Sequence, residues 1–274
     1  MTKATHERRG SVALAIRILL LLLFLVGCGG GREGRGITLA GSTSVEPFAG
    51  LLAERYRAEH PQSPPINVQG GGSSAGIQAA QSGSAEIGMS SRWLKEEERG
   101  LETILIAWDA IAIIVHPSNP LSDLTLNQVG EIFAGRIENW ASLGGSDRPI
   151  TVVTREEGSG TRGAFEELVM GGERITPAAL RQDSNGAVRV IVAGDPGAIG
   201  YISLGIVDER VKPLSIEGVS PSQETVASEA YGLVRPFLFL VRGEPQGLAK
   251  DFIDYVLSPS GQEILEEEGL VRVE

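Results

Sequence analysis

The stretch TREEGSGTRGAFEEL, residues 154–168, predicts the end of a strand, a glycine-rich turn and the start of a helix. The β-branched run at 152–154 suits a buried strand, and an amphipathic pattern begins near Thr161. The first N–H groups of a helix lack intrahelical partners and carry a partial positive charge. Together with the hydroxyls of Ser159 and Thr161 and the bare backbone of Gly160, they predict a site for a tetrahedral oxyanion.

Two arginines flank this turn. Arg155 lies at the strand end, where its planar guanidinium could bind two oxygens of an anion at once. Arg162 lies further along, and we expect it to face solvent. The plainer alternative is an ordinary helix cap beside a surface arginine, and this stretch by itself is compatible with either interpretation.

Three more turns repeat the order of strand, hydroxyl-rich turn and helix. STSVEP (42–47) follows a predicted strand, as do GGGSSAG (70–76) and Ser91. Ligands of open α/β sheets gather at the carboxyl ends of the strands, so we expect all four turns to converge on one site.

Two apolar segments predict strands that cross between two lobes: ILIAWDAIAIIVHP (104–117) and YGLVRPFLFLVR (231–242). A chain that leaves its first lobe and later returns to it forms a clamp with paired hinge strands and a ligand cleft between the lobes. We therefore predict a two-lobed α/β fold. Lobe I comprises 37–115 plus 234–274, and lobe II comprises 116–233.

The N-terminus predicts a lipoprotein export signal over residues 1–28. A basic start leads into an apolar run that ends in Leu25-Val-Gly-Cys28, which resembles the bacterial lipobox. Cys28 is the chain's single cysteine, so it has no intrachain disulfide partner and is free to be lipidated. The segment at 29–36 then predicts a flexible tether. The alternative is a transmembrane stub with an incidental cysteine.

Without residues 1–27 the chain keeps 20 basic and 34 acidic residues, because that segment holds 4 of the 24 Lys+Arg and 1 of the 35 Asp+Glu. The resulting net charge of −14 argues against binding nucleic acid or anionic lipid head groups through a basic patch. An anion site in such a chain must work through short-range hydrogen bonds.

One motif favours an enzyme, the pattern GSSAG at 72–76, in which Ser74 would be a hydrolase nucleophile. The only histidine after it is His116, which precedes a proline in a predicted hinge, so a catalytic triad lacks its base. The phosphate-loop pattern GxxxxGK[ST] is absent, and no cysteine or histidine pair has metal-ligand spacing. We therefore expect no enzyme activity, no metal and no cofactor.

From Ile37 onward the chain resembles the substrate-binding proteins of phosphate ABC importers. The carrying motifs are AGSTSVEP (40–47), GGGSSAG (70–76), IGMSSR (87–92), TREEGSGTR (154–162) and GAIGYISLG (197–205). The resemblance implies a type II periplasmic-binding-protein fold that captures inorganic phosphate outside the cytoplasm and delivers it to an ABC permease and its ATPase. It also implies phosphate contacts from Thr43, Ser44, Ser73, Arg155, Ser159, Gly160 and Thr161.

One position departs from the family pattern, in which an aspartate accepts the proton of bound phosphate. Ser91 occupies this position, and its hydroxyl can still bind phosphate. Selectivity for phosphate over sulfate or arsenate stays open, because a serine has no carboxylate to repel a fully deprotonated oxyanion. Arg92 either adds positive charge to the site or pairs with Glu96 or Glu97. Binding of another tetrahedral oxyanion and service as a phosphate sensor lobe remain alternatives.

The anchor makes the first testable prediction. Replacing Cys28 with serine removes the thiol that would carry the lipid, so the Cys28→Ser protein should be released from the membrane or remain unprocessed. Membrane fractionation and the mass of the N-terminal peptide measure this. Unchanged membrane retention with an unmodified N-terminus would contradict it.

Overall fold

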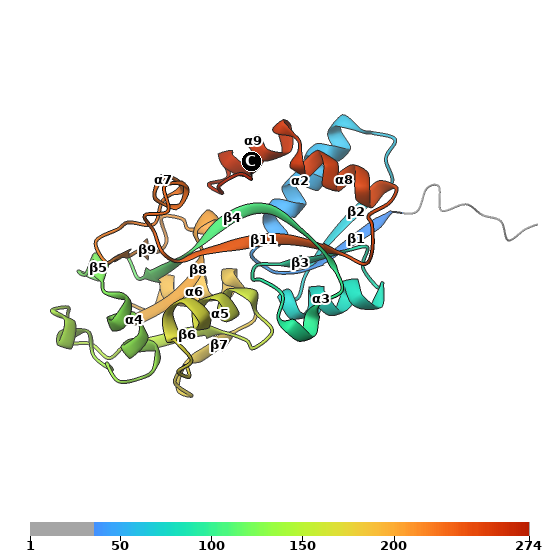
Figure 1. Ribbon diagram of the computed structural model, residues 1–274. Helices are drawn as coiled ribbons and strands as arrows, with labels where there is room; N and C mark the ends of the chain where they lie inside the picture. Colours follow the sequence, from blue (N-terminus) through green and yellow to red (C-terminus); the bar gives the residue numbers. More distant parts are fainter. Residues whose placement is uncertain (1–35, 274) are drawn as a thin grey trace, which may run out of the picture. The chain divides into compact units, whose positions relative to one another are not determined.

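Two long strands run side by side through the computed structural model, which describes residues 36–273 (Figure 1). They are β4 (Glu102–Val115) and β11 (Val234–Val241), paired antiparallel along the whole of β11. Both are almost continuous apolar runs, as strands covered on both faces require. These are the two segments that the sequence predicts to cross, and the strand assignments are confirmed.

Parallel strands extend the sheet beyond β11. In order from β11 they are β3 (Ile87–Ser90), β1 (Ile37–Gly41) and β2 (Ile66–Gly70). Helices α2 (Glu46–Glu59), α8 (Leu248–Leu257) and α9 (Pro259–Glu267) cover one face, and α3 (Ser73–Ser82) covers the other. Phe48, Phe237 and Phe252 are fully or almost fully buried in the larger of the two resulting apolar clusters.

The sheet continues on the other side of β4 with three more strands. β8 (Ala198–Ser203) pairs antiparallel with β4, and β6 (Thr151–Arg155) and β7 (Leu180–Gln182) follow in parallel. Helix α6 (Asn185–Gly194) packs on one face, while α4 (Leu126–Phe133) and α5 (Gly160–Phe165) pack on the other. Phe165 stacks on Tyr201 with 4.1 Å between ring centroids, at the centre of this second core.

Short elements complete the described chain. They are β5 (Asp123–Leu124) paired with β10 (Ser215–Ile216), β9 (Lys212–Pro213) paired with β4, α7 (Gln223–Ala227), the 3₁₀ turns Glu96–Glu98, Trp140–Leu143 and Leu204–Ile206, and a π-helical turn Glu166–Met170.

The crossing strands contribute to both cores. Along β4, Ala107 packs with the core around Phe48, whereas Ala110 packs with the core around Phe165. The predicted lobe boundaries at 115 and 234 remain a prediction. The export signal, Cys28 and all of the tether except Gly36 lie outside the described residues.

Within residues 36–273, no helix combines the length and apolar character that a membrane span requires.

The packing of α3 on the sheet makes a second prediction. A Cβ on Gly76 would lie 2.6 Å from the Ala40 carbonyl oxygen and 2.7 Å from both the Gly41 Cα and the Met89 carbonyl oxygen, so Gly76→Ala forces backbone apart. We expect it to lower the free energy of unfolding by about 1–3 kcal/mol. A Cβ on Gly50 in α2 meets nothing within 4 Å, so Gly50→Ala should raise that free energy by about 0.5–1 kcal/mol. Urea unfolding followed by circular dichroism measures both free energies. The same change in Gly76→Ala and Gly50→Ala would contradict the close packing of Gly76 on the sheet.

Candidate functional site

Four hydroxyl-rich turns meet in one place. They lie at the ends of β1, β3 and β6 and at the start of α3. The Ser42 hydroxyl donates to Ser91 Oγ at 2.9 Å, and the Ser91 backbone N–H donates to Ser73 Oγ at 3.1 Å. Ser44 Oγ lies 2.9 Å from Thr161 Oγ1, which comes from the other side of the crossing strands. All five side chains are at most 2 % exposed. The predicted convergence of the turns is therefore present in the fold.

The turn after β6 approaches the first group of strands very closely. Ser159 caps α5 by accepting a hydrogen bond from the Arg162 backbone N–H at 3.2 Å. A Cβ on Gly160 would lie only 2.1 Å from Ser73 Oγ and 2.6 Å from Ser91 Oγ. A side chain at this position would displace both serines, because the Gly160 backbone lies directly against their hydroxyls.

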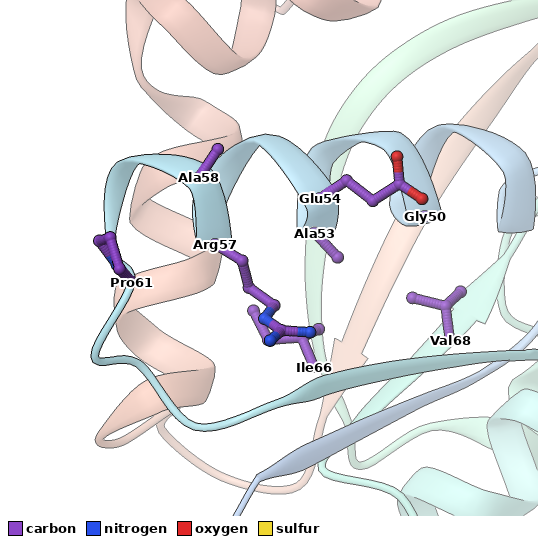
Figure 2. A pocket seen from close by; sticks show the side chains of 8 residues that line it. All are labelled: Gly50, Ala53, Glu54, Arg57, Ala58, Pro61, Ile66 and Val68. Atoms are coloured by element: carbon purple, nitrogen blue, oxygen red, sulfur yellow. The ribbon is translucent and has the colours of Figure 1, made fainter.

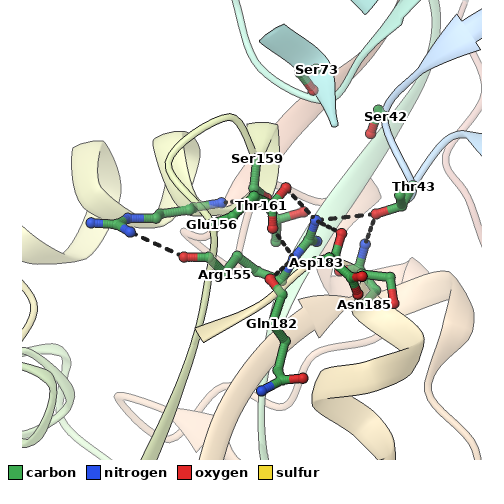
Figure 3. A network of polar contacts seen from close by, with 12 residues as sticks. Ser42, Thr43, Ser73, Arg155, Glu156, Ser159, Thr161, Gln182, Asp183 and Asn185 are labelled. Atoms are coloured by element: carbon green, nitrogen blue, oxygen red, sulfur yellow. Dashed lines mark hydrogen bonds and ion pairs between the residues drawn. The ribbon is translucent and has the colours of Figure 1, made fainter. Parts of the chain in front are cut away.

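Arg155 lies 1 % exposed among these groups, and Figure 3 shows its guanidinium between Thr43 and Glu156. Its Nη2 donates to Thr43 Oγ1 at 3.2 Å, to Glu156 Oε1 at 3.0 Å and to the Asp183 carbonyl at 3.0 Å. Its Nη1 is buried and has no hydrogen-bond partner among the described residues. An unpaired buried guanidinium nitrogen is costly, so this atom points to a ligand that accepts hydrogen bonds.

Asn185 joins the site, although the sequence analysis did not select it. It is the first residue of α6, is 1 % exposed, and donates through Nδ2 to Ser44 Oγ at 2.8 Å and Thr43 Oγ1 at 3.2 Å. Its Oδ1 is buried without a partner. The signal was available in the sequence, because Ser184 and Asn185 begin an apolar helical pattern directly after a strand, in the same way as Ser159 begins α5.

A buried ion pair on the crossing strands forms the rear of the site. Arg235 on β11 lies opposite Asp109 on β4 and donates to Asp109 Oδ2 through Nε at 2.9 Å and Nη2 at 2.8 Å. Both side chains are 1 % exposed. Burial raises the pKa of Asp109 and lowers the pKa of Arg235, and the contact between the two charges opposes both shifts. The sequence analysis treated this segment only as a crossing strand.

Two expectations about arginines were wrong. Arg92 pairs with Glu98 rather than with Glu96 or Glu97, at 2.7 Å to each carboxylate oxygen. It is only 6 % exposed, because its stem packs against helix α5 at Gly163. Arg162 does not face solvent: its side chain is 13 % exposed, and its Nη1 donates to the Arg155 carbonyl at 3.1 Å. It therefore braces the backbone of Arg155.

Other kinds of site find little support in residues 36–273. Ser74 Oγ accepts a hydrogen bond from Arg92 at 3.3 Å, while His60 stacks on Tyr56 and His116 bonds to Ser118, so Ser74 has no imidazole base. No group of three or more acidic, histidine or cysteine side chains in the described chain could hold a metal ion.

A surface pocket of about 620 Å³ lies between α2 and β2 (Figure 2). Small and apolar residues line most of it, with Glu54 and Arg57 as its only charged groups. None of the residues lining it belongs to the convergent turns.

Comparisons with known proteins agree with this geometry. A model of the PBP superfamily domain matches residues 26–260. The phosphate-binding protein PstS of Bacillus subtilis is 30 % identical, and the alignment covers 97 % of this chain and 95 % of that protein.

Solved structures give the same result. A structure from Clostridium perfringens, described as a candidate phosphate ABC transporter substrate-binding protein with bound phosphate, superposes with a TM-score of 0.84 at 43 % identity, covering 88 % of this chain and all of that one. An ABC-type phosphate transport receptor from Vibrio cholerae gives 0.72 at 40 % identity, covering 86 % of this chain and all of that one. The family resemblance and the α/β fold class predicted from the sequence are confirmed.

The Arg92–Glu98 pair makes a third prediction. Hydrogen bonds from Arg92 hold the pKa of Glu98 below its ordinary value of 4.5. A lowered carboxyl pKa stabilises the fold above the ordinary pKa, and that contribution is lost as the pH falls through the folded-state value. Glu98→Gln should therefore cost stability at pH 7, and the difference from wild type should shrink toward pH 3.

Urea unfolding between pH 7 and pH 3 measures this difference. Glu96→Gln is the matched control, since Glu96 is in the same turn but its side chain is 84 % exposed. A difference between Glu98→Gln and wild type that stays constant with pH would contradict the assignment.

Proposed function

The chain belongs to the PBP superfamily and, within it, to the family of the PstS phosphate-binding proteins, and from this premise we propose that it captures inorganic phosphate for an ABC importer. It is a solute-binding protein rather than an enzyme. The proposed phosphate ligands are Thr43, Ser44, Ser73, Ser91, Arg155, Ser159, Gly160 and Thr161.

The unpartnered Nη1 of Arg155 is the observation that carries this proposal. It lies in a network whose other members are mostly hydroxyl and amide donors, so the group that best completes it is an anion with several acceptor oxygens. A guanidinium and a tetrahedral oxyanion also form short, charge-assisted hydrogen bonds.

The two groups of strands supply opposite sides of the proposed site, which supports a clamp. Thr43, Ser44, Ser73 and Ser91 come from one group, and Arg155, Ser159 and Thr161 come from the other. We propose that the lobes at 37–115 plus 234–274 and at 116–233 close around phosphate. The hinge would then lie at the irregularity in the pairing of β11 with β4, between Phe237 and Leu238, next to the point where the cores change along β4.

Anchoring and delivery complete the proposal. Cys28 at the end of an export signal supports a lipid-anchored protein at the extracytoplasmic face of the membrane. From there it would deliver phosphate to a permease and its ATPase complex, the assembly for which its relatives are named.

Ser91 favours one alternative, the binding of another tetrahedral oxyanion. A serine does not present the carboxylate that would repel sulfate, and Ser91 already accepts a hydrogen bond from Ser42. Sulfate binding as tight as phosphate binding would favour this alternative. A phosphate sensor lobe would bind phosphate equally well and would differ in lacking a permease partner.

Removal of the Arg155 side chain provides the fourth prediction. Arg155→Ala should weaken phosphate binding at least about tenfold, because charge-assisted hydrogen bonds in a buried site are lost. Arg155→Lys should recover only part of this, since an ammonium keeps the charge but not the planar fork. Calorimetric titration of the delipidated, dialysed protein with phosphate, sulfate and a phosphonate measures both the affinity and the selectivity.

Arg181→Ala is the matched control, because Arg181 lies on the neighbouring strand β7 but its side chain is 58 % exposed. It should bind phosphate like wild type. A wild-type protein that binds none of the three anions would overturn the proposed function.

A further inference from the structure

The hydroxyl of Ser44 is a junction of three segments that are distant in the sequence. Its Oγ accepts from Asn185 Nδ2 at 2.8 Å and from Arg235 Nη2 at 3.0 Å, and it lies 2.9 Å from Thr161 Oγ1. All four side chains are at most 1 % exposed, so water does not compete for these contacts.

Counting protons fixes the direction of each bond. A serine hydroxyl has one proton to donate and two lone pairs to accept with. A guanidinium and an amide nitrogen only donate, so Arg235 and Asn185 occupy both lone pairs of Ser44. The Ser44 proton must then go to Thr161 Oγ1, which in turn leaves the Thr161 proton with no acceptor among the described residues.

The guanidinium of Arg235 is held in place for this role. Nε and one hydrogen of Nη2 bond to Asp109 Oδ2 on the neighbouring strand, and the second hydrogen of Nη2 points to Ser44. The guanidinium carbon also lies 5.5 Å from the centre of the Phe237 ring. Asp109 Oδ1 and Arg235 Nη1 are buried without a partner among the described residues, so the ion pair is not built to satisfy both groups fully. The hydrogen that Nη2 gives to Ser44 instead of to Asp109 Oδ1 indicates a second role for Arg235.

We propose that Arg235 is a positioning residue of the anion site, which orients the Ser44 hydroxyl so that Thr161 presents its proton to the bound anion. This inference rests on the proposed function, because the anion is taken to be phosphate. It adds to the site a cation and an acid, Arg235 and Asp109, that act on the anion through the Ser44 and Thr161 hydroxyls.

A mutant cycle on phosphate affinity tests the proposal. Asp109→Asn/Arg235→Gln removes both charges and leaves two amides, so no unpaired charge is buried. This variant and Thr161→Val should each weaken phosphate binding by up to about tenfold, the cost of one oriented hydrogen bond. If Arg235 acts through Thr161, the combined variant should bind within about twofold of Thr161→Val alone.

Independent effects would instead multiply to about a hundredfold loss, and that result would overturn the proposal. So would wild-type affinity in Asp109→Asn/Arg235→Gln. Glu131→Gln/Arg136→Gln, which removes an Arg–carboxylate pair elsewhere on the chain, is the control and should bind like wild type. Loss of binding in wild type itself would be a failure of the proposed function, which the same titration identifies separately.

Arg235→Lys covers the case in which the double substitution does not fold. The ammonium can keep the ion pair with Asp109, but it lacks the rigid fork that reaches Asp109 and Ser44 together. Its melting temperature without phosphate should therefore stay close to wild type while its phosphate affinity falls. A pair that only stabilised the sheet predicts phosphate affinity like that of wild type, and that result would overturn the proposal.

Discussion

The site depends on one buried guanidinium. It lies where the ends of strands from the two groups flanking β4 and β11 meet. Arg155 is 1 % exposed, and the one carboxylate that contacts it, Glu156, has a side chain 34 % exposed. A buried charge needs a close partner of opposite sign, and a partly solvated carboxylate supplies only part of that. The positive charge of Arg155 is therefore available at short range to a ligand. The net charge of −14 acts over longer distances, where salt screens it beyond about 8 Å.

Two arginines lie in the site, but they are neutralised differently. Asp109 is as deeply buried as Arg235 and takes two hydrogen bonds from it, so this pair is close to neutral as a unit. Arg155 has no such deeply buried carboxylate beside it, although each arginine has an Nη1 without a hydrogen-bond partner among the described residues. The positive charge that remains for an anion is therefore concentrated on Arg155. Arg235 instead orients the hydroxyl of Ser44 and, through it, that of Thr161. The two side chains have the same chemistry but different roles because of the acids beside them.

The sequence predicted the parts of the site that depend on local patterns. A β-branched strand, a glycine-rich turn and a helix cap are all encoded within a few residues, which is why the strand β6 and the helix start at Ser159 and Gly160 were placed correctly. That these residues bind phosphate stays a prediction. Arg235 was missed because its contact with Ser44 joins residues 191 positions apart and depends on how β11 pairs with β4. Arg162 was misplaced because helical spacing alone gave no sign that its guanidinium turns back to the strand carbonyl at Arg155.

The crossing strands connect the fold to the site in one further way. Asp109 and Arg235 face each other just before the irregularity in pairing between Phe237 and Leu238, and beside the point where the apolar cores change. In a clamp, bending would concentrate where the pairing is irregular rather than where a buried ion pair fixes the register. The register at Arg235 would then stay constant while the two groups of strands move. Ser44 and Thr161, which come from opposite groups, could form their hydrogen bond only in the closed arrangement, so closure itself would complete the donor set that the anion requires.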